Sequence, residues 1–233
     1  SSYWMVIEKY RKNKKAKLLS VFLLFFGLQG FAQSHEGHNH TEGDGHNHEQ
    51  SVMHTRKAPT EAELDTLLKS NTVKAEHAAK FGRLIIQDAG GRMKPINTFS
   101  SELLRKVSHE NTFKGMNSDQ VFLSMTQFAN IWLEVPLIYI TPKNDSIRKI
   151  IGIDTKAKFA PFISFFDEKG NYKLSPYLDA AYKAANPNQF EKDFIETDKK
   201  VNLMESALSG RILKIFPIPN HENSKWVSYL ELN

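Results

Sequence analysis

The residues best suited to metal chemistry are histidines gathered in one short stretch, residues 34–50. They are His35, His38, His40, His46 and His48, and the pattern Gly-His-Asn-His occurs twice. Imidazole nitrogens bind Zn, Cu and Ni, so the tract is a candidate for metal capture. Its glycines and asparagines fix no geometry and nothing in it is apolar, which favours a disordered linker. The alternative is therefore a solvated linker whose histidines bind metal only incidentally.

The sequence carries none of the common catalytic or nucleotide-binding motifs. The sequence contains no phosphate-binding loop, no His-Glu-x-x-His and no Gly-x-Ser-x-Gly. Cysteine is absent, which excludes disulfides, thiolate zinc sites, thiol nucleophiles and a covalent haem attachment motif within this chain. Carboxylates are plentiful, but local spacing places no two of them as a catalytic pair. No enzyme signature follows from these residues.

Positive charge is concentrated near the beginning of the chain. The net charge is +5, and six of the basic residues lie between Lys9 and Lys17. This is a local cluster rather than a basic stripe along a domain, so nucleic acid is excluded as a partner. Residues 18–32 follow as an apolar run, and the positive-inside rule then predicts that residues after about 33 lie in the periplasm, outside the inner membrane.

The apolar run has two interpretations. As a helix its 15 residues span about 22 Å, short of the roughly 30 Å hydrocarbon core. It is either a cleaved signal segment, ending at the small residues Gly30 and Ala32, or a short transmembrane helix. We therefore divide the chain into a basic cytoplasmic segment (1–17), a transmembrane or signal helix (18–32), a His-rich linker (33–58) and an extracytoplasmic domain (59–233). The chain begins at Ser1 rather than at Met, and we expect it to be a fragment of a longer polytopic protein.

The domain is predicted to be helix-rich α+β with a few short strands. The expected helices are 61–71 with a capping box from Thr60, 72–80 ended by Gly82, one capped by Asn97 or Thr98, one capped by Asn117 or Ser118, 145–151 ended by Gly152, 175–185 and 188–209 ended by Gly210. The expected strands are 84–87 and 92–96 around a glycine turn, 135–140 and 213–216. Phenylalanines at 159, 162, 165 and 166 follow helical spacing, and we predict that their side chains are buried in the core.

Several motifs occur in a characteristic order along this domain. Residues 76–84 read EHAAKFGRL, residues 87–98 read QDAGGRMKPINT, and the motifs SELLRKV, DQVFL, a tryptophan before VPLI, KKVNL and LKIFPIP follow. This order resembles the extracytoplasmic segment of fused System II cytochrome c biogenesis proteins of the Bacteroidetes type (CcsB/CcsA-like or ResB/ResC-like), over about two thirds of the chain. The stretch 87–98 is its most specific part.

The resemblance implies a polytopic membrane protein that carries haem outward and presents it to apocytochrome c. It implies haem as cofactor, with the membrane, apocytochrome c and other biogenesis subunits as partners. The family handles haem with histidines beside a tryptophan-rich segment, and that segment is absent from this chain. The part seen here is therefore expected to be a scaffold or docking domain.

Three residues of the domain are candidates for haem or partner contacts under this resemblance. His77 could ligate haem iron, and Arg92 and Lys94 could contact a haem propionate or a partner carboxylate. The alternatives are a surface or cap histidine and two solvated turn cations. A rival function is an exported or membrane-anchored metal-binding protein with the histidine tract as its active element. An exported hydrolase built from scattered residues is a third class.

Overall fold

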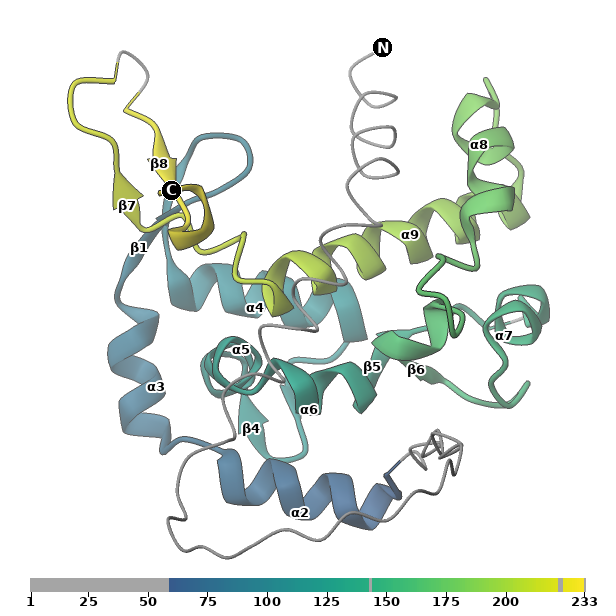
Figure 1. The fold of residues 1–233 in the computed structure, drawn as a ribbon, viewed down its shortest axis with the longest axis horizontal. Helices are drawn as coiled ribbons and strands as arrows, with labels where there is room; N and C mark the ends of the chain where they lie inside the picture. Colours follow the sequence, from purple (N-terminus) through teal and green to yellow (C-terminus); the bar gives the residue numbers. More distant parts are fainter. Residues whose placement is uncertain (1–58, 143, 222–223, 233) are drawn as a thin grey trace, which may run out of the picture. The chain divides into compact units, whose positions relative to one another are not determined.

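The computed structural model describes residues 59–142, 144–221 and 224–232 (Figure 1). The predicted basic segment, the transmembrane or signal helix and the five metal-candidate histidines lie outside these residues. Among the helices of the described ranges, none is long and apolar enough to cross a membrane.

Eight α-helices and four two-stranded antiparallel sheets make up the described part of the chain. The helices are α2 (Glu61–Asn71), α3 (Ala75–Gly82), α4 (Ile96–Ser108), α5 (Ser118–Gln127), α6 (Ala129–Glu134), α7 (Asp145–Ile151), α8 (Ser175–Lys183) and α9 (Gln189–Leu208), with 3-10 turns η1 (Phe162–Phe165) and η2 (Tyr229–Glu231). The antiparallel pairs are β1 (Ile85–Gln87) with β2 (Met93–Pro95), β3 (Thr112–Phe113) with β4 (Met116–Asn117), β5 (Pro136–Tyr139) with β6 (Phe159–Pro161), and β7 (Phe216–Pro217) with β8 (Trp226–Val227). The predicted helix-rich α+β class is confirmed.

Helix α4 lies at the centre of the packing (Figure 1). Its apolar residues recur at helical spacing, so one face is buried against α3, α5, α9 and β5. The face consists of Ile96, Phe99, Leu103, Leu104 and Val107. Trp132 of α6 is fully buried in the same core, and its indole Nε1 donates to Ser124 Oγ at 2.9 Å, which satisfies its polar atom.

The helix ends that carry local capping chemistry are confirmed. Thr60, Asn117 and Asn188 each form a capping box with the residue three positions later. Gly152 and Gly210 adopt the left-handed conformation after α7 and α9 (φ 77° and 76°). These short-range signals fix the start or end of four helices because each depends on only a few neighbouring residues.

Other predicted boundaries of the first helices are wrong. Thr72 is the C-cap of α2 rather than the N-cap of α3, and its hydroxyl donates back to the Leu68 carbonyl at 2.5 Å. Helix α3 begins only at Ala75, after Lys74. Helix α4 begins at Ile96 after Pro95, with no side-chain cap from Asn97 or Thr98. Gly82 is the last residue of α3 rather than a left-handed stop. A Cβ there would lie 2.5 Å from Asp119 Oδ2, so glycine permits the close approach of α3 and α5.

Later boundaries also differ from the sequence prediction. Helix α8 begins at Ser175, with Leu174 and not Ser175 as its cap residue. Phe159 lies in a strand, Phe162 and Phe165 lie in a 3-10 turn, and Phe166 follows that turn. Phe162 and Phe165 are buried as expected, whereas Phe159 and Phe166 are partly exposed. The strand predicted at 213–216 is reduced to Phe216–Pro217, and helix α6 and the β3–β4 hairpin were not predicted.

Candidate functional site

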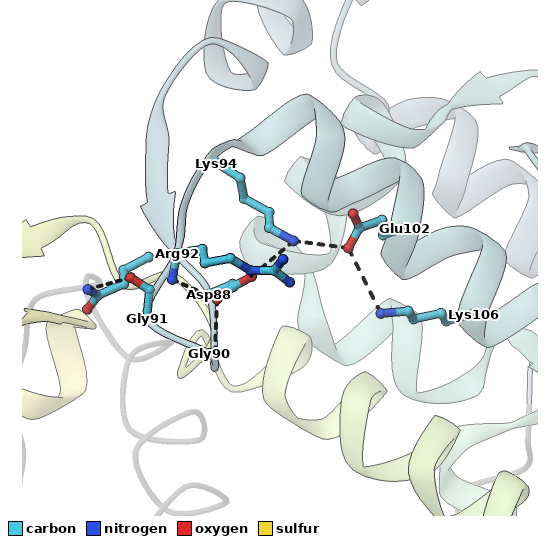
Figure 2. Close-up of polar contacts among 8 residues, drawn as sticks. Asp88, Gly90, Gly91, Arg92, Lys94, Glu102 and Lys106 are labelled. Atoms are coloured by element: carbon cyan, nitrogen blue, oxygen red, sulfur yellow. Dashed lines mark hydrogen bonds and ion pairs between the residues drawn. The ribbon is translucent and has the colours of Figure 1, made fainter.

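The β1–β2 hairpin carries the most specific motif of the chain, and Asp88 organises its turn (Figure 2). One carboxylate oxygen, Oδ1, accepts hydrogen bonds from the amides of Gly90 (2.9 Å) and Arg92 (3.0 Å). Gly91 has φ +82°, a conformation that favours glycine, and its amide donates to the Asp88 carbonyl at 3.0 Å. The Asp-x-Gly-Gly-Arg sequence therefore specifies a closed turn.

The second carboxylate oxygen of Asp88 begins a chain of charges that reaches α4 (Figure 2). Lys94 Nζ lies 3.1 Å from Asp88 Oδ2 and 3.2 Å from Glu102 Oε2, and Lys106 Nζ lies 3.9 Å from the same Glu102 oxygen. We call these four residues the hairpin ion network. Because Glu102 and Lys106 belong to α4, the network fastens the hairpin to the central helix.

The pKa values of the network follow from these contacts. The Arg92 amide and the Lys94 ammonium hold the pKa of Asp88 below its usual range. Hydrogen bonds to the Asp88 and Glu102 carboxylates raise the pKa of Lys94. Both groups are therefore charged at neutral pH, and the positive charge of Lys94 is neutralised inside the network.

Gln87 joins the same hairpin to the C-terminal part of the domain. Its side chain is buried, and Nε2 donates to the carbonyls of Gly91 (3.1 Å) and Ser224 (3.2 Å). Its Oε1 accepts from the amide of Trp226 at 2.8 Å. The glutamine of the QDAGG motif is thus a structural connector between β1 and the strand β8.

Exposed side chains lie on both faces of the hairpin. The Arg92 side chain is 82% exposed, with its Nε 3.6 Å from Asp88 Oδ2. Leu84, Ile85 and Met93 are also exposed, and the strand register places Ile85 and Met93 on one face of the hairpin. Arg92 directly precedes Met93 and lies on the other face of the hairpin, where its guanidinium and Lys94 approach the same Asp88 oxygen. An exposed guanidinium suits recognition of a carboxylate-bearing partner, and the hairpin contains no nucleophile or acid–base pair.

The structure brings together two of the three residues that were predicted to contact haem or a partner. Arg92 and Lys94 both lie against Asp88, but Lys94 is occupied by two carboxylates whereas Arg92 faces solvent. His77 is exposed on α3, and no described hydrogen bond or ion pair links it to either cation. The described residues contain no group of three or more His, Asp or Glu that could hold a metal ion.

A second polar cluster was missed from the sequence. Lys200 of α9 is 4% exposed; its Nζ donates to the Tyr139 carbonyl at 3.2 Å and lies 5.0 Å from the centroid of the Tyr139 ring. The His109 ring stacks on Tyr139 with centroids 4.2 Å apart. Burial lowers the pKa of Lys200, and burial together with the Lys200 charge lowers that of His109. Helical spacing could have indicated Lys200, because it lies on the same face of α9 as Met204.

Comparison with known proteins gives one informative match. No protein-family model matches the chain. The chain is 33% identical over 171 residues to protein NrfI of Wolinella succinogenes, an alignment that covers 72% of this chain and 19% of that protein. The chain therefore spans about a fifth of the length of the relative it matches.

Proposed function

We propose that this chain is the extracytoplasmic segment of a cytochrome c biogenesis protein, in which it serves as a scaffold and docking domain. The order of motifs between residues 76 and 226 resembles System II biogenesis proteins. The similarity to NrfI supports a role in cytochrome c biogenesis and haem attachment. Because the chain spans only 19% of NrfI, we assign the haem chemistry to parts of the protein beyond this segment.

The observation that carries the docking role is the use of the 87–98 motif in the structure. Asp88 and Lys94 form the turn and the link to α4, and Gln87 forms the link to β8. What the motif leaves at the surface is the guanidinium of Arg92 on one face of the hairpin and the side chain of Met93 on the other. A firmly held hairpin with an exposed guanidinium is suited to binding a partner, and preorganisation lowers the entropy lost on binding.

The proposal extends to location and partners. Residues 18–32 would hold the chain in the inner membrane, with the described domain in the periplasm. Apocytochrome c or another biogenesis subunit would meet the hairpin, and haem would be the cofactor of the complete protein. Arg92 is the candidate for a haem propionate or partner carboxylate, and His77 is a candidate ligand at a separate place on α3.

The test replaces the chromosomal gene with variants and measures covalent haem in c-type cytochromes by haem staining. Arg92→Glu reverses the exposed charge and is expected to lower holocytochrome c while the protein level stays constant. Lys156→Glu, a reversal at an exposed loop cation, is the matched control and should leave haem attachment unchanged. Normal cytochrome c in a strain lacking the gene would refute the biogenesis role. If holocytochrome c is lost in the deletion strain but normal in Arg92→Glu, the biogenesis role stands and only the docking role of the hairpin is refuted.

The metal-binding function remains the alternative because five histidines lie close together in residues 34–50. Deleting that stretch separates the two functions. Reduced tolerance of Zn, Cu or Ni with normal cytochrome c would favour the metal-binding protein, whereas normal metal tolerance would favour a linker.

A further inference from the structure

A pocket opens where the segment after β5 and the start of α7 meet the first turns of α9. Its volume is about 400 Å³. It is lined by Thr141, Pro142, Asn144, Gln189, Phe190 and Asp193. This volume lies within the roughly 300–1,000 Å³ typical of ligand sites, so it has room for a side chain or a small molecule.

The polar wall of the pocket is the carboxylate of Asp193. This residue is only 5% exposed. Its Oδ1 accepts from Gln189 Nε2 at 2.8 Å, and its Oδ2 accepts from Asn144 Nδ2 at 3.1 Å. Both donors are neutral amides, and the described residues place no Lys, Arg or His nitrogen within 4.0 Å of it. The fold thus buries a carboxylate and orients it with two hydrogen bonds, and within the described part of the chain the charge of Lys200 acts on it from beyond ion-pair distance.

An aromatic residue stands beside this carboxylate. Phe190 is 46% exposed, and its ring packs on Phe194 with centroids 4.7 Å apart, which holds it in place. Gln189, Phe190 and Asp193 come from the same two turns of α9, so the acid and the ring are fixed relative to one another. A carboxylate next to an aromatic face is the combination that attracts organic cations, through an ion pair and a cation–π contact.

We propose that this pocket binds an alkylammonium or guanidinium group, with Asp193 as the ion partner and Phe190 as the aromatic wall. A divalent metal fits less well, because the pocket offers one carboxylate and the described residues form no cluster of metal ligands. The cation has two possible sources, a lysine or arginine side chain of a polypeptide and a free small amine. The site does not involve the hairpin, so the inference is independent of the proposed function.

The experiment uses the full chain, purified in detergent, and measures binding of a dye-labelled glycine-serine peptide with one central lysine by fluorescence anisotropy. The matched peptide carries norleucine, which keeps the four-carbon stem without the charge. We expect the lysine peptide to bind about tenfold more tightly than the norleucine peptide. Competition by n-butylamine would identify a free amine as sufficient, and binding that butylamine does not displace would identify a polypeptide side chain.

Two variants locate the binding. Asp193→Asn should reduce lysine-peptide binding to the norleucine level, and Asp179→Asn, at an exposed carboxylate of α8, is the control that should not change it. Because Asp193 also accepts two hydrogen bonds, Phe190→Leu provides a second variant that leaves the acid intact, with an expected reduction of about threefold. Equal binding of the two peptides, absence of binding, or unchanged binding by Asp193→Asn in a protein of normal circular dichroism would overturn the proposal.

Discussion

The fold treats charged side chains in the β1–β2 hairpin and on α9 in opposite ways. In the hairpin, Lys94 lies within 3.2 Å of carboxylate oxygens from both Asp88 and Glu102. On α9, Asp193 and Lys200 are more deeply buried, yet neither forms an ion pair with any described residue. The charges of the hairpin neutralise each other at close range, whereas the close polar contacts of Asp193 and Lys200 in the described residues are neutral amides and a backbone carbonyl.

This difference separates structural charges from charges that a ligand could satisfy. A charge with an ion partner in the folded chain gains little from a new one, while a buried charge without a partner gains much. Arg148 shows that a buried cation can also be satisfied mainly by backbone carbonyls, with the Asp145 carboxylate no nearer than 3.9 Å. It donates to the carbonyls of Ala157, Thr141, Asn144 and Ile140 at 2.8–3.2 Å.

The largest expected effect on stability comes from removing the Arg148 guanidinium. Arg148→Met leaves four carbonyls around β5 and α7 without a donor, and we expect a loss of about 3 kcal/mol or more in the free energy of unfolding. Urea unfolding followed by circular dichroism measures it. Lys149→Met, at the exposed neighbour, should change the same quantity by less than about 0.5 kcal/mol. A loss for Arg148→Met as small as that of Lys149→Met would show that water replaces the guanidinium.

The hairpin side of the comparison is tested by Asp88→Ala. This change removes the acceptor of two amides and the ion partner of Lys94, with an expected loss of about 1–3 kcal/mol in the free energy of unfolding. Asp88→Asn keeps an acceptor oxygen without the charge and should lose less.

The same residue predicts a pH dependence. The pKa of Asp88 is lowered by folding, so its contribution is present above the unfolded value of about 3.9 and is lost as the pH falls through the folded pKa. The difference in unfolding free energy between wild type and Asp88→Ala should therefore shrink below about pH 4. A constant difference from pH 7 to pH 2.5 would assign the whole effect to packing.

The hairpin could be predicted from the sequence because its chemistry is local. Asp88 bonds Gly90 and Arg92 within four residues, and Gly91 adopts the positive φ that the turn requires. The capping box at Thr60 was predicted for the same reason, as were a cap at Asn117 or Ser118 and a helix start at Asn188; Asn117 and Asn188 also form capping boxes.

The remaining features depend on contacts between distant parts of the chain. Gln87 meets Trp226, and Asp193 meets Asn144, across 139 and 49 positions, so neither partner could be read from spacing. Gly82 looked like a helix stop, but its reason is the Asp119 carboxylate of another helix. Lys200 was indicated only by its position on the apolar face of α9, and Tyr139, which receives its hydrogen bond, lies 61 positions away.

A smaller effect with the opposite sign is expected at Lys200. Lys200→Met replaces a buried ammonium by an apolar side chain of similar length, so the unfolding free energy at pH 7 should be unchanged or rise by about 1 kcal/mol. Since burial lowers the pKa of Lys200, the unfolded chain binds this proton more tightly than the folded one. Wild-type stability should therefore rise relative to Lys200→Met as the pH increases from 7 toward about 10. Parallel pH profiles for the two proteins would mean that the ammonium is already satisfied in the fold.

The smallest effect on stability is expected at Arg92. Its side chain is 82% exposed, and its one ion contact within the described residues is at 3.6 Å. Arg92→Ala should therefore alter the unfolding free energy by less than about 0.5 kcal/mol. The hairpin ion network does not include it, because Lys94 alone bridges Asp88 and Glu102. Thermal unfolding of the two proteins in the same detergent measures the change. A larger loss would make Arg92 part of the structural network, whereas reduced holocytochrome c at unchanged stability would identify it as a contact to a partner, the one charge of the hairpin that the fold leaves for that purpose.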